Sequence, residues 1–245
     1  IESPDKLWYH SLSGLSILGT GRYVPSLSVT NSMLEGIVDT SDEWITSRTG
    51  ISSRTIAREE DSTLSMAAEA AKEAIAQAGI AKEQIAVVAV ATITGDYVTP
   101  SLSCLLQKTL ELPAQIMAID VNAACCGFVY AIKTAHALLE GIEDRYALVI
   151  GCEMLSKIVD YTDRRTCILF GDGAGAAIVK RSESGAFCFD SGAMGDSDIL
   201  SARAGYFANN PFASREGDSK PRAFEMNGTE VFRFAVEHAP DRKRL

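Results

Sequence analysis

The sequence predicts an α/β protein whose mostly parallel sheet is covered by helices on both faces. Three observations support this class. Ile85 to Ile93 is a nearly continuous apolar run rich in valine, Tyr146 to Ile150 is a second such run, and one-sided helical patterns separate them. Strands that are apolar on both faces are typical of parallel sheets, because helices cover both sides of such a sheet.

The N-terminal elements are short. Leu15 to Thr20 reads as a strand that ends at a glycine-containing turn. Thr40-Ser41-Asp42-Glu43 has the form of a capping box, with Thr at the cap and Glu three residues later. It predicts a helix from about Ser41 to Thr49. Trp44 and Arg48 are four residues apart, so we expect them to share one face of this helix.

The central elements alternate between helix and strand. Thr63 to Ala78 has apolar residues at the 3-4 spacing of a one-sided helix, and Gly79 ends it. After Ser182 the weak periodicity predicts loops, an edge strand near Ala186 to Phe189, and a final helix from Thr229 broken by Pro240. Between these we expect a helix over Ser101 to Leu110, a strand over Ile116 to Val121, a helix from about Cys126 to Leu139, the strand Tyr146 to Ile150, and strands at Cys167 to Phe170 and Ala174 to Val179 linked through the glycine-rich Gly171 to Ala176.

Composition excludes several classes of protein. The net charge of −9 offers no global basic field to a nucleic acid. The longest mainly apolar run, Ile85 to Ile93, is far shorter than the roughly 20 residues of a membrane-spanning helix. The six cysteines are too sparse for a disulfide scaffold, so we expect mostly buried thiols and a reducing cytoplasm. The N-terminal residues lack the pattern of a secretory signal.

Cys125 is the strongest candidate for a reactive group. It follows the predicted strand that ends near Val121, at the point where a helix begins. A helix N-terminus favours a thiolate over a thiol and so makes a nucleophile. Ala123, Ala124 and Gly127 are small and leave room for an acyl chain. The alternative is an inert buried thiol, and the neighbouring Cys126, expected to pack beneath the helix, competes for the same role.

Other groups of residues give weaker evidence for a functional site. The three histidines are scattered and no C-x2-C pair exists, so we expect no metal site. His136 lies 11 residues along the same helix from Cys125, about 16 Å away, too far to act as its base. Trp44 and Arg48, together with Asp163-Arg164-Arg165, could form an aromatic and cationic lip for a nucleotide-bearing ligand. Solvated surface charges are the alternative interpretation.

The motifs taken together resemble 3-oxoacyl-[acyl-carrier-protein] synthase III, over about Leu15 to Ala235. The resemblance implies a thiolase-like fold and a homodimer that starts fatty acid biosynthesis by decarboxylating condensation of acetyl-CoA, or another acyl-CoA, with malonyl-acyl carrier protein. The motifs that carry it are Gly19-Thr20-Gly21-x-Tyr23-x-Pro25, Thr40-Ser41-Asp42-Glu43-Trp44-Ile45-x-x-Arg48-Thr49-Gly50-Ile51, Ala123-Ala124-Cys125-x-Gly127-Phe128, and Thr162-Asp163-Arg164 followed by Phe170-Gly171-Asp172-Gly173-Ala174-Gly175-Ala176.

The resemblance also implies roles for single residues. Cys125 would be the nucleophile that takes the acyl group. Trp44 and Arg164 would sandwich the adenine of CoA, with Thr40 in contact with it and Arg48 near its phosphates. Thr99 matches the position of a bulky aromatic residue that closes the acyl pocket across the dimer in some members, so we expect a longer pocket here. CoA enters as a thioester substrate, and no cofactor is implied.

By the same resemblance we expect an N-terminal extension (1–14), a thiolase-like half (15–182), and a loop-rich segment with the beginning of a second half (183–245). The family's catalytic His and Asn belong to that second half and have no counterpart up to Leu245. We therefore expect this chain to perform at most the acyl-transfer half-reaction. A noncatalytic CoA-binding or dimer-partner protein is the alternative. Hydroxymethylglutaryl-CoA and plant polyketide synthases are a third candidate class, disfavoured by the Thr40 to Ile51 motif.

Overall fold

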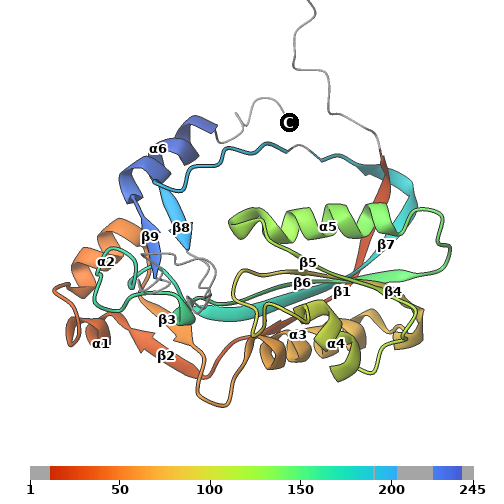
Figure 1. Cartoon of the computed structure of the whole chain (residues 1–245), viewed down its shortest axis with the longest axis horizontal. Coiled ribbons are helices and arrows are strands. Elements are labelled where there is room, and N and C mark those ends of the chain that lie inside the picture. The colour runs from red at the N-terminus through yellow and green to blue at the C-terminus, as the bar shows by residue number, and fades with distance from the viewer. Residues whose placement is uncertain (1–11, 190, 203–222, 239–245) are drawn as a thin grey trace, which may run out of the picture. The chain divides into compact units, whose positions relative to one another are not determined.

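The computed structural model describes residues 12–189, 191–202 and 223–238 (Figure 1). Short 3-10 turns at Lys82–Gln84, Ala124–Cys126 and Leu155–Lys157 connect the main elements. In chain order these are β1 (Leu12–Tyr23), β2 (Leu27–Thr30), α1 (Asn31–Glu35), α2 (Asp42–Thr49), β3 (Ser53–Ile56), α3 (Thr63–Ala78), β4 (Ile85–Ala91), α4 (Leu102–Thr109), β5 (Met117–Val121), α5 (Gly127–Leu138), β6 (Tyr146–Met154), β7 (Asp172–Phe187), β8 (Leu200–Ala202), β9 (Phe224–Met226) and α6 (Gly228–His238).

The chain divides into two compact units. The first comprises residues 1–28, 55–155 and 171–192, and the second comprises residues 29–54, 156–170 and 193–245. Each unit is therefore assembled from segments that are distant in the sequence. Among the described residues, no helix is long and apolar enough to cross a membrane.

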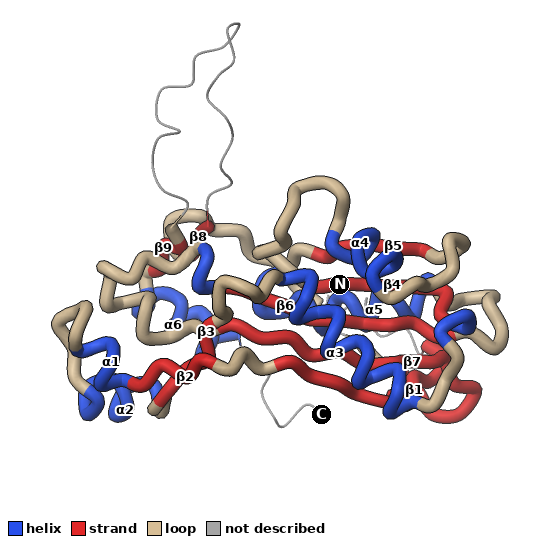
Figure 2. Tube along the Cα trace, turned by 90° about the horizontal axis from the view of Figure 1, so that it is seen from below, coloured by secondary structure: helices blue, strands red, loops and turns tan. Residues whose placement is uncertain are grey.

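A five-stranded sheet forms the centre of the first unit, with the strand order β1-β7-β6-β4-β5 (Figure 2). β4 is parallel to both of its neighbours, β5 and β6. β7 is antiparallel to β6 and to β1, so the predicted mostly parallel sheet is in fact mixed. The reason is the link between β6 and β7. It contains turns and no crossover helix, and a strand that returns beside its predecessor without a crossover runs antiparallel.

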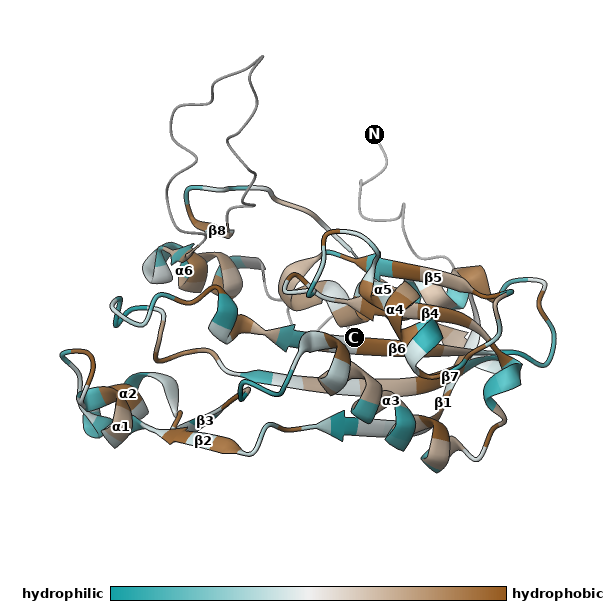
Figure 3. Cartoon of the chain, turned by 60° about the horizontal axis from the view of Figure 1, so that its bottom comes forward, coloured by the Kyte–Doolittle hydropathy of each residue, from teal (hydrophilic) through white to brown (hydrophobic). Residues whose placement is uncertain are grey.

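Helices cover both faces of this sheet, as predicted. α3 and α4 lie on one face and α5 on the other (Figure 1). β4 shows why: Val88 and Val90 pack in the α3 cluster, whereas Val87 and Ala89 pack in the α5 cluster. In Figure 3, β4 and β6 are coloured as hydrophobic along most of their length. Burial on both faces explains the continuous apolar runs in the sequence.

α3 matches its predicted bounds because both ends are encoded locally. The Ser62 side chain caps the N-terminus in a capping box with Ser65, and Gly79 ends the helix with φ of +64°. The helix also packs closely on β1. A Cβ atom on Gly21 would lie 2.1 Å from the Ala70 carbonyl oxygen, so only glycine fits at this contact.

The strand predicted at Ala174 to Val179 is confirmed within β7, but the strand predicted at Cys167 to Phe170 and the glycine-rich crossing were wrong. Cys167 to Phe170 forms turns in the second unit, where Cys167 and Ile168 are buried against Leu34 and Ile45. This apolar run fills a helix-lined core instead of pairing with another strand. The glycine-rich segment is the first part of β7 and not a crossing between two strands.

The predicted edge strand at Ala186 to Phe189 is also corrected. Ala186 and Phe187 are the last residues of β7, where Ala186 pairs with Ser13 of β1. Pro240, the predicted end of the last helix, lies outside the described residues.

The second unit contains α1, α2, the paired β8 and β9, and α6. The N-cap of α2 is Ser41, whose side chain accepts a hydrogen bond from Trp44 N, and not Thr40 as the capping-box pattern predicted. The helix therefore begins one residue later than that pattern implies. Buried Arg54 donates to the carbonyl oxygens of Val29 and Ile168, at 3.1 and 3.0 Å, and so joins two of the three segments of this unit.

Candidate active site

Cys125 lies in a 3-10 turn between β5 and α5 and is exposed. The residue before it, Ala124, has φ of +43°, a left-handed conformation that is uncommon for alanine. α5 begins two residues later, and its N-cap, Cys126, makes no side-chain capping hydrogen bond. The first N–H groups of α5 are thus left without a side-chain cap, and they stabilise negative charge at this turn.

Cys125 lies at the same edge of the sheet as the loop that follows β4. β4 and β5 are parallel, and Thr92 N donates to the Val121 carbonyl oxygen at 3.3 Å. Gly127 packs on β4 so closely that an added Cβ would lie 3.0 Å from the Ala91 Cβ. The carboxyl ends of parallel strands are where ligands bind in α/β proteins, which supports the sequence-based choice of this turn.

Thr99 lies in the loop that links β4 to α4, and its side chain is exposed. At the far end of this loop, Asp120 of β5 accepts hydrogen bonds from Leu102 N and Ser103 N, at 2.7 and 2.8 Å. These bonds tie the start of α4 to the strand that leads to Cys125. Thr99 and Cys125 therefore belong to segments that leave neighbouring strands of one sheet.

The other cysteines differ from their predicted environment. Only Cys152 and Cys167 are buried, whereas Cys104, Cys126 and Cys188 are exposed. Cys126 does not pack beneath the helix because it forms the N-cap, ahead of Gly127, the first buried residue of α5. Exposure alone thus does not separate Cys125 from Cys126.

His136 is a packing residue in α5. It is buried, and its ring lies 5.0 Å from the ring of Phe187 in β7. This agrees with its exclusion as the base for Cys125. Within the described residues, no group of three or more His, Cys, Asp or Glu side chains is arranged to hold a metal ion.

In the second unit, two guanidinium groups lie over the indole of Trp44. Arg48 Cζ is 4.4 Å from the ring centroid and Arg164 Cζ is 5.1 Å from it. The sequence therefore predicted correctly that Trp44 and Arg48 share a helix face. Helical spacing could not place Arg164 on the same ring, since Arg164 is 120 residues away along the chain, but the predicted aromatic and cationic lip and the family resemblance did bring the two residues together.

Arg164 also borders a groove of about 480 Å³ in this unit, lined by Ile37, Val38, Asp39, Thr162, Asp163, Arg164 and Arg165. Its guanidinium donates to the Asp39 carbonyl oxygen at 2.7 Å. The neighbouring Arg165 is engaged differently, because it forms a bidentate pair with Asp163 and lowers the pKa of that carboxyl. Thr40 Oγ1 is buried and has no hydrogen-bond partner in the described part of the chain.

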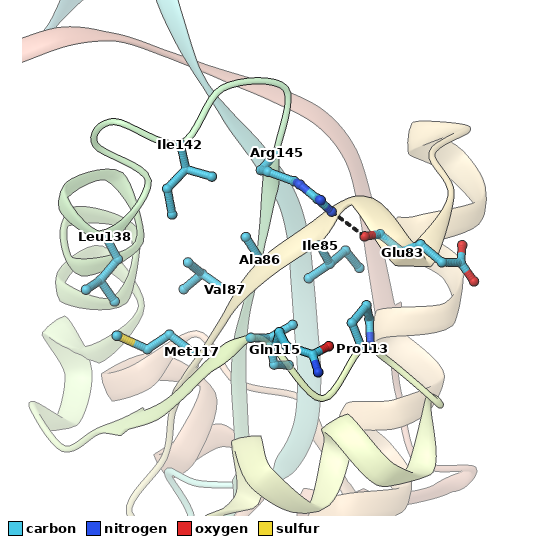
Figure 4. Close-up of a pocket in the computed structure, with 11 residues that line it drawn as sticks. Glu83, Ile85, Ala86, Val87, Pro113, Gln115, Met117, Leu138, Ile142 and Arg145 are labelled. Atoms are coloured by element: carbon cyan, nitrogen blue, oxygen red, sulfur yellow. Dashed lines mark hydrogen bonds between the residues drawn. The ribbon is translucent and has the colours of Figure 1, made fainter.

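A larger cavity of about 540 Å³ lies elsewhere in the first unit (Figure 4). Its lining includes Ile85 and Val87 of β4 and Met117 of β5, and Arg145 donates to the Glu83 carbonyl oxygen at its rim. These residues belong to the amino ends of the parallel strands, whereas Cys125 follows the carboxyl end of β5. The cavity therefore lies at the opposite end of the sheet from the candidate nucleophile.

Comparison with known proteins decides the family. The family model of 3-oxoacyl-[acyl-carrier-protein] synthase III matches residues 119–196. A beta-ketoacyl-[acyl-carrier-protein] synthase III of Clostridium botulinum (strain Loch Maree / Type A3) is 46% identical over 226 residues, which cover 92% of this chain and 69% of the relative. The chain belongs to the beta-ketoacyl-[acyl-carrier-protein] synthase III family.

Solved structures of this synthase III family agree with the fold. The 3-oxoacyl-[acyl-carrier-protein] synthase III of Aquifex aeolicus is 40% identical with a TM-score of 0.73, and covers 91% of this chain and 68% of its own. The synthase III of Pseudomonas aeruginosa is 35% identical with a TM-score of 0.79, and covers 91% and 67%. The fold is thus thiolase-like, and members of this family are condensing acyltransferases.

Sequence analysis missed one group in this synthase III chain. Glu153, the second-last residue of the otherwise apolar strand β6, is half-buried, and its partial burial raises the pKa of its carboxyl. It accepts hydrogen bonds from Ile93 N at 2.9 Å and from Thr94 Oγ1 at 2.5 Å, both in the loop that carries Thr99. An acidic residue that interrupts the apolar run of β6 was the signal that could have revealed it.

Proposed function

We propose that this chain transfers an acyl group from acyl-CoA to Cys125, as the first half-reaction of a beta-ketoacyl-acyl carrier protein synthase III. The observation that carries the proposal is the position of Cys125, exposed at the uncapped start of α5 within the matched family motif. The experiment that tests it is measurement of the intact mass after incubation with acetyl-CoA, which should detect one acetyl group on Cys125.

The acyl-transfer step follows from this position. The Cys125 thiolate attacks the thioester carbonyl, so that its sulfur bonds to the acyl carbon and the bond from that carbon to the CoA sulfur breaks. CoA leaves as a thiolate and takes up a proton. N–H groups at the start of α5 stabilise the negative charge that develops at the turn. The acyl-CoA is a substrate, and the proposed step needs neither a resident cofactor nor a metal.

For the second half-reaction, which by the resemblance also needs a catalytic His and Asn that were not found in this sequence, we propose decarboxylating condensation with malonyl-acyl carrier protein, the reaction that starts fatty acid synthesis. Loss of CO2 from the malonyl group generates a carbanion. This carbanion attacks the acyl carbon on Cys125, a carbon–carbon bond forms, and the bond to the Cys125 sulfur breaks. The products are a 3-oxoacyl-carrier protein and the regenerated thiolate. Relatives of this chain carry the name of this activity.

We propose that Trp44, Arg48, Arg164 and Thr40 bind the adenine end of CoA. Trp44 offers a half-buried aromatic face, and Arg48 and Arg164 supply positive charge beside it for the CoA phosphates. A base stacked between Trp44 and Arg164 needs about 7 Å, twice a van der Waals contact. Arg164 therefore has to move outward by about 2 Å when the adenine enters. The unpartnered hydroxyl of Thr40 is available for a hydrogen bond.

Substitutions at this site are expected to weaken CoA binding. Trp44→Ala removes the aromatic face on which the adenine stacks, and Arg164→Ala removes the guanidinium on the other side of the adenine. Each change is expected to raise the Kd for CoA about tenfold. Trp44→Phe keeps an aromatic ring and is expected to lose less CoA affinity than Trp44→Ala. Isothermal titration with CoA measures these constants. Arg165→Ala is the matched control, because its guanidinium is bound to Asp163. Equal losses of CoA affinity in Arg164→Ala and Arg165→Ala would contradict the role of Arg164 in CoA binding.

We propose that Thr99 of one protomer lines the acyl pocket of its partner across the dimer. Its loop leaves β4 beside β5, the edge strand of the sheet, which supports a place close to a second copy. Threonine is smaller than the aromatic residue that some members carry there. The proposed pocket therefore accepts acyl groups longer than acetyl.

We propose that the protein forms a homodimer through the open edge of β5. β5 ends the strand order of the sheet, and Met117 and Ile119 on it are 51% and 36% exposed. An unpaired edge with exposed apolar side chains is suited to pairing with a second copy.

Ile119→Lys is expected to convert the dimer to a monomer, because a charge on an edge strand opposes strand pairing. Sedimentation equilibrium measures the mass in solution. Ile17→Lys is the control, since Ile17 is an exposed isoleucine on β1 at the other edge of the same sheet. A dimer that persists in Ile119→Lys, or is lost equally in both variants, would rule out this interface.

We also propose a cytoplasmic location. All six cysteines are free thiols, four of them exposed, which suits a reducing compartment.

A further inference from the structure

Glu153 occupies an unusual position at the end of the sheet. It is the second-last residue of β6, opposite Gly173 of β7, one residue beyond Cys152. The parallel pairing of β4 with β6 ends at Ala91 and Gly151, so the carboxyl group lies where β4 gives way to the following loop. This is the same edge of the sheet from which Cys125 follows β5.

The Glu153 carboxylate holds three consecutive residues of that loop. One oxygen accepts from Ile93 N at 2.9 Å, and the other accepts from Thr94 Oγ1 at 2.5 Å and from Thr92 Oγ1 at 3.4 Å. Thr94 Oγ1 in turn accepts from Met154 N at 2.8 Å. The loop is therefore fastened to the end of β6 through a connected set of hydrogen bonds.

Further contacts fasten the loop on either side of Thr99. The Asp96 carboxylate accepts from Thr63 N at 3.1 Å and Leu64 N at 2.8 Å, at the start of α3. Beyond Thr99, Asp120 holds the start of α4. Between these anchors Tyr97 and Val98 are exposed, Val98 at 98%. The conformation of the Thr99 segment thus depends on the anchors at its two ends.

Within the described residues, Glu153 forms no ion pair with a basic side chain, and burial raises the pKa of its carboxyl. A half-buried carboxyl without a cation joins two segments at a cost in desolvation, and apolar packing would be at least as stable. The carboxylate instead makes the contact directional, because only hydrogen-bond donors at fixed positions on the loop can reach its oxygens. The desolvation cost of the Glu153 carboxyl therefore indicates that the protein requires one defined conformation of this loop.

We propose that Glu153 is a positioning residue that sets which acyl groups are accepted at Cys125, by holding the loop from Thr92 to Pro100 in place. The proposal rests on the acyl transfer proposed above. Glu153 does not touch the reacting atoms in this scheme. It acts through Thr94 and the loop on the wall that Thr99 contributes, across the proposed dimer, to the acyl pocket of the partner.

The test is acyl selectivity, measured on the whole chain as two second-order rate constants for acylation of Cys125, with acetyl-CoA and with hexanoyl-CoA, by intact mass. Glu153→Ala leaves the Ile93 and Thr94 donors without their acceptor and frees the loop. The ratio of the two constants is expected to change about tenfold, the scale of pocket-based discrimination. Glu153→Gln keeps an acceptor for Ile93 N and is expected to retain the ratio within about twofold.

Thr94→Val tests the same link from the loop side. It removes the hydroxyl that joins Glu153 to Met154 N, so its ratio should move in the same direction as that of Glu153→Ala. The double variant should add little to the larger single effect, because both changes break one network. If Glu153→Ala does not fold, Thr94→Val decides the question. Glu143→Gln, at an exposed glutamate of the same unit, is the control and should leave the ratio unchanged.

A purely structural role for Glu153 would lower the folded fraction and reduce both constants equally, which leaves their ratio unmoved. An unchanged ratio in Glu153→Ala and Thr94→Val, or in Thr94→Val alone if the first does not fold, overturns the proposal. Failure of the underlying acyl transfer has a different signature, since the unmodified chain would then take up no acyl group from either thioester.

Discussion

Cys125→Ala is expected to abolish the acyl adduct that forms with acetyl-CoA. The unmodified chain should gain one acetyl group, located on Cys125 by peptide mapping, because that thiol lies at the uncapped start of α5. Without the sulfur no nucleophile remains at this turn, and the acylation rate should fall by a factor of at least about 1,000. Intact mass spectrometry of the two proteins over time measures the effect.

Cys126→Ala is the matched control for this experiment. Cys126 is adjacent, exposed and close to the same helix terminus, yet the family motif assigns the reaction to Cys125. Acylation of Cys126→Ala should proceed within about threefold of the original rate. An adduct that persists in Cys125→Ala and disappears in Cys126→Ala would reverse the assignment. CoA binding without any adduct on the unmodified chain would favour the noncatalytic CoA-binding protein.

Gly21→Ala is expected to cause the largest loss of stability. The new Cβ would lie 2.1 Å from the Ala70 carbonyl oxygen and 2.5 Å from Ala74 N. Both atoms belong to the backbone of α3, so the helix has to shift away from β1. Such overpacking costs about 3 kcal/mol in free energy of unfolding, which corresponds to a fall in Tm of roughly 6 to 12 °C for a chain of this size.

Gly175→Ala provides the control for Gly21→Ala. Gly175 lies in β7 and pairs with Arg22 of β1, next to Gly21, but a Cβ atom there would have no atom within 4 Å. The change is expected to alter the free energy of unfolding by less than about 1 kcal/mol. Thermal and urea unfolding of both variants give the comparison. Similar losses for both would show that lost backbone freedom, and not contact with α3, explains the effect.

The local sequence was sufficient where an element carries its own end signals. The Ser62 cap and Gly79 bound α3, and the 3-4 spacing between them fixes its buried face. The same holds for β4, since its unbroken apolar run is explained by cover on two faces. The end signals of α2 were one residue off, because Thr40 and Ser41 are equally good caps by residue type and only the backbone conformation selects Ser41.

The local sequence was insufficient to predict the structure where an apolar segment could be buried either as a strand or as turns. Cys167 to Phe170 has the composition of a strand, but the buried cluster around Leu34 and Ile45 takes it up as turns. The direction of β7 was likewise not readable, because strand direction depends on how the chain returns after β6 and not on residue type.

By itself, the sequence determined the α/β class, the position of Cys125 at the start of a helix and the shared face of Trp44 and Arg48. Each of these depends on residues within a few positions of one another, and side-chain spacing or backbone chemistry dictates them. Only the tertiary structure decided that Gly21 meets α3 and that Glu153 holds the loop of Thr99. These contacts join segments far apart along the chain, and packing of the whole chain is what brings them together.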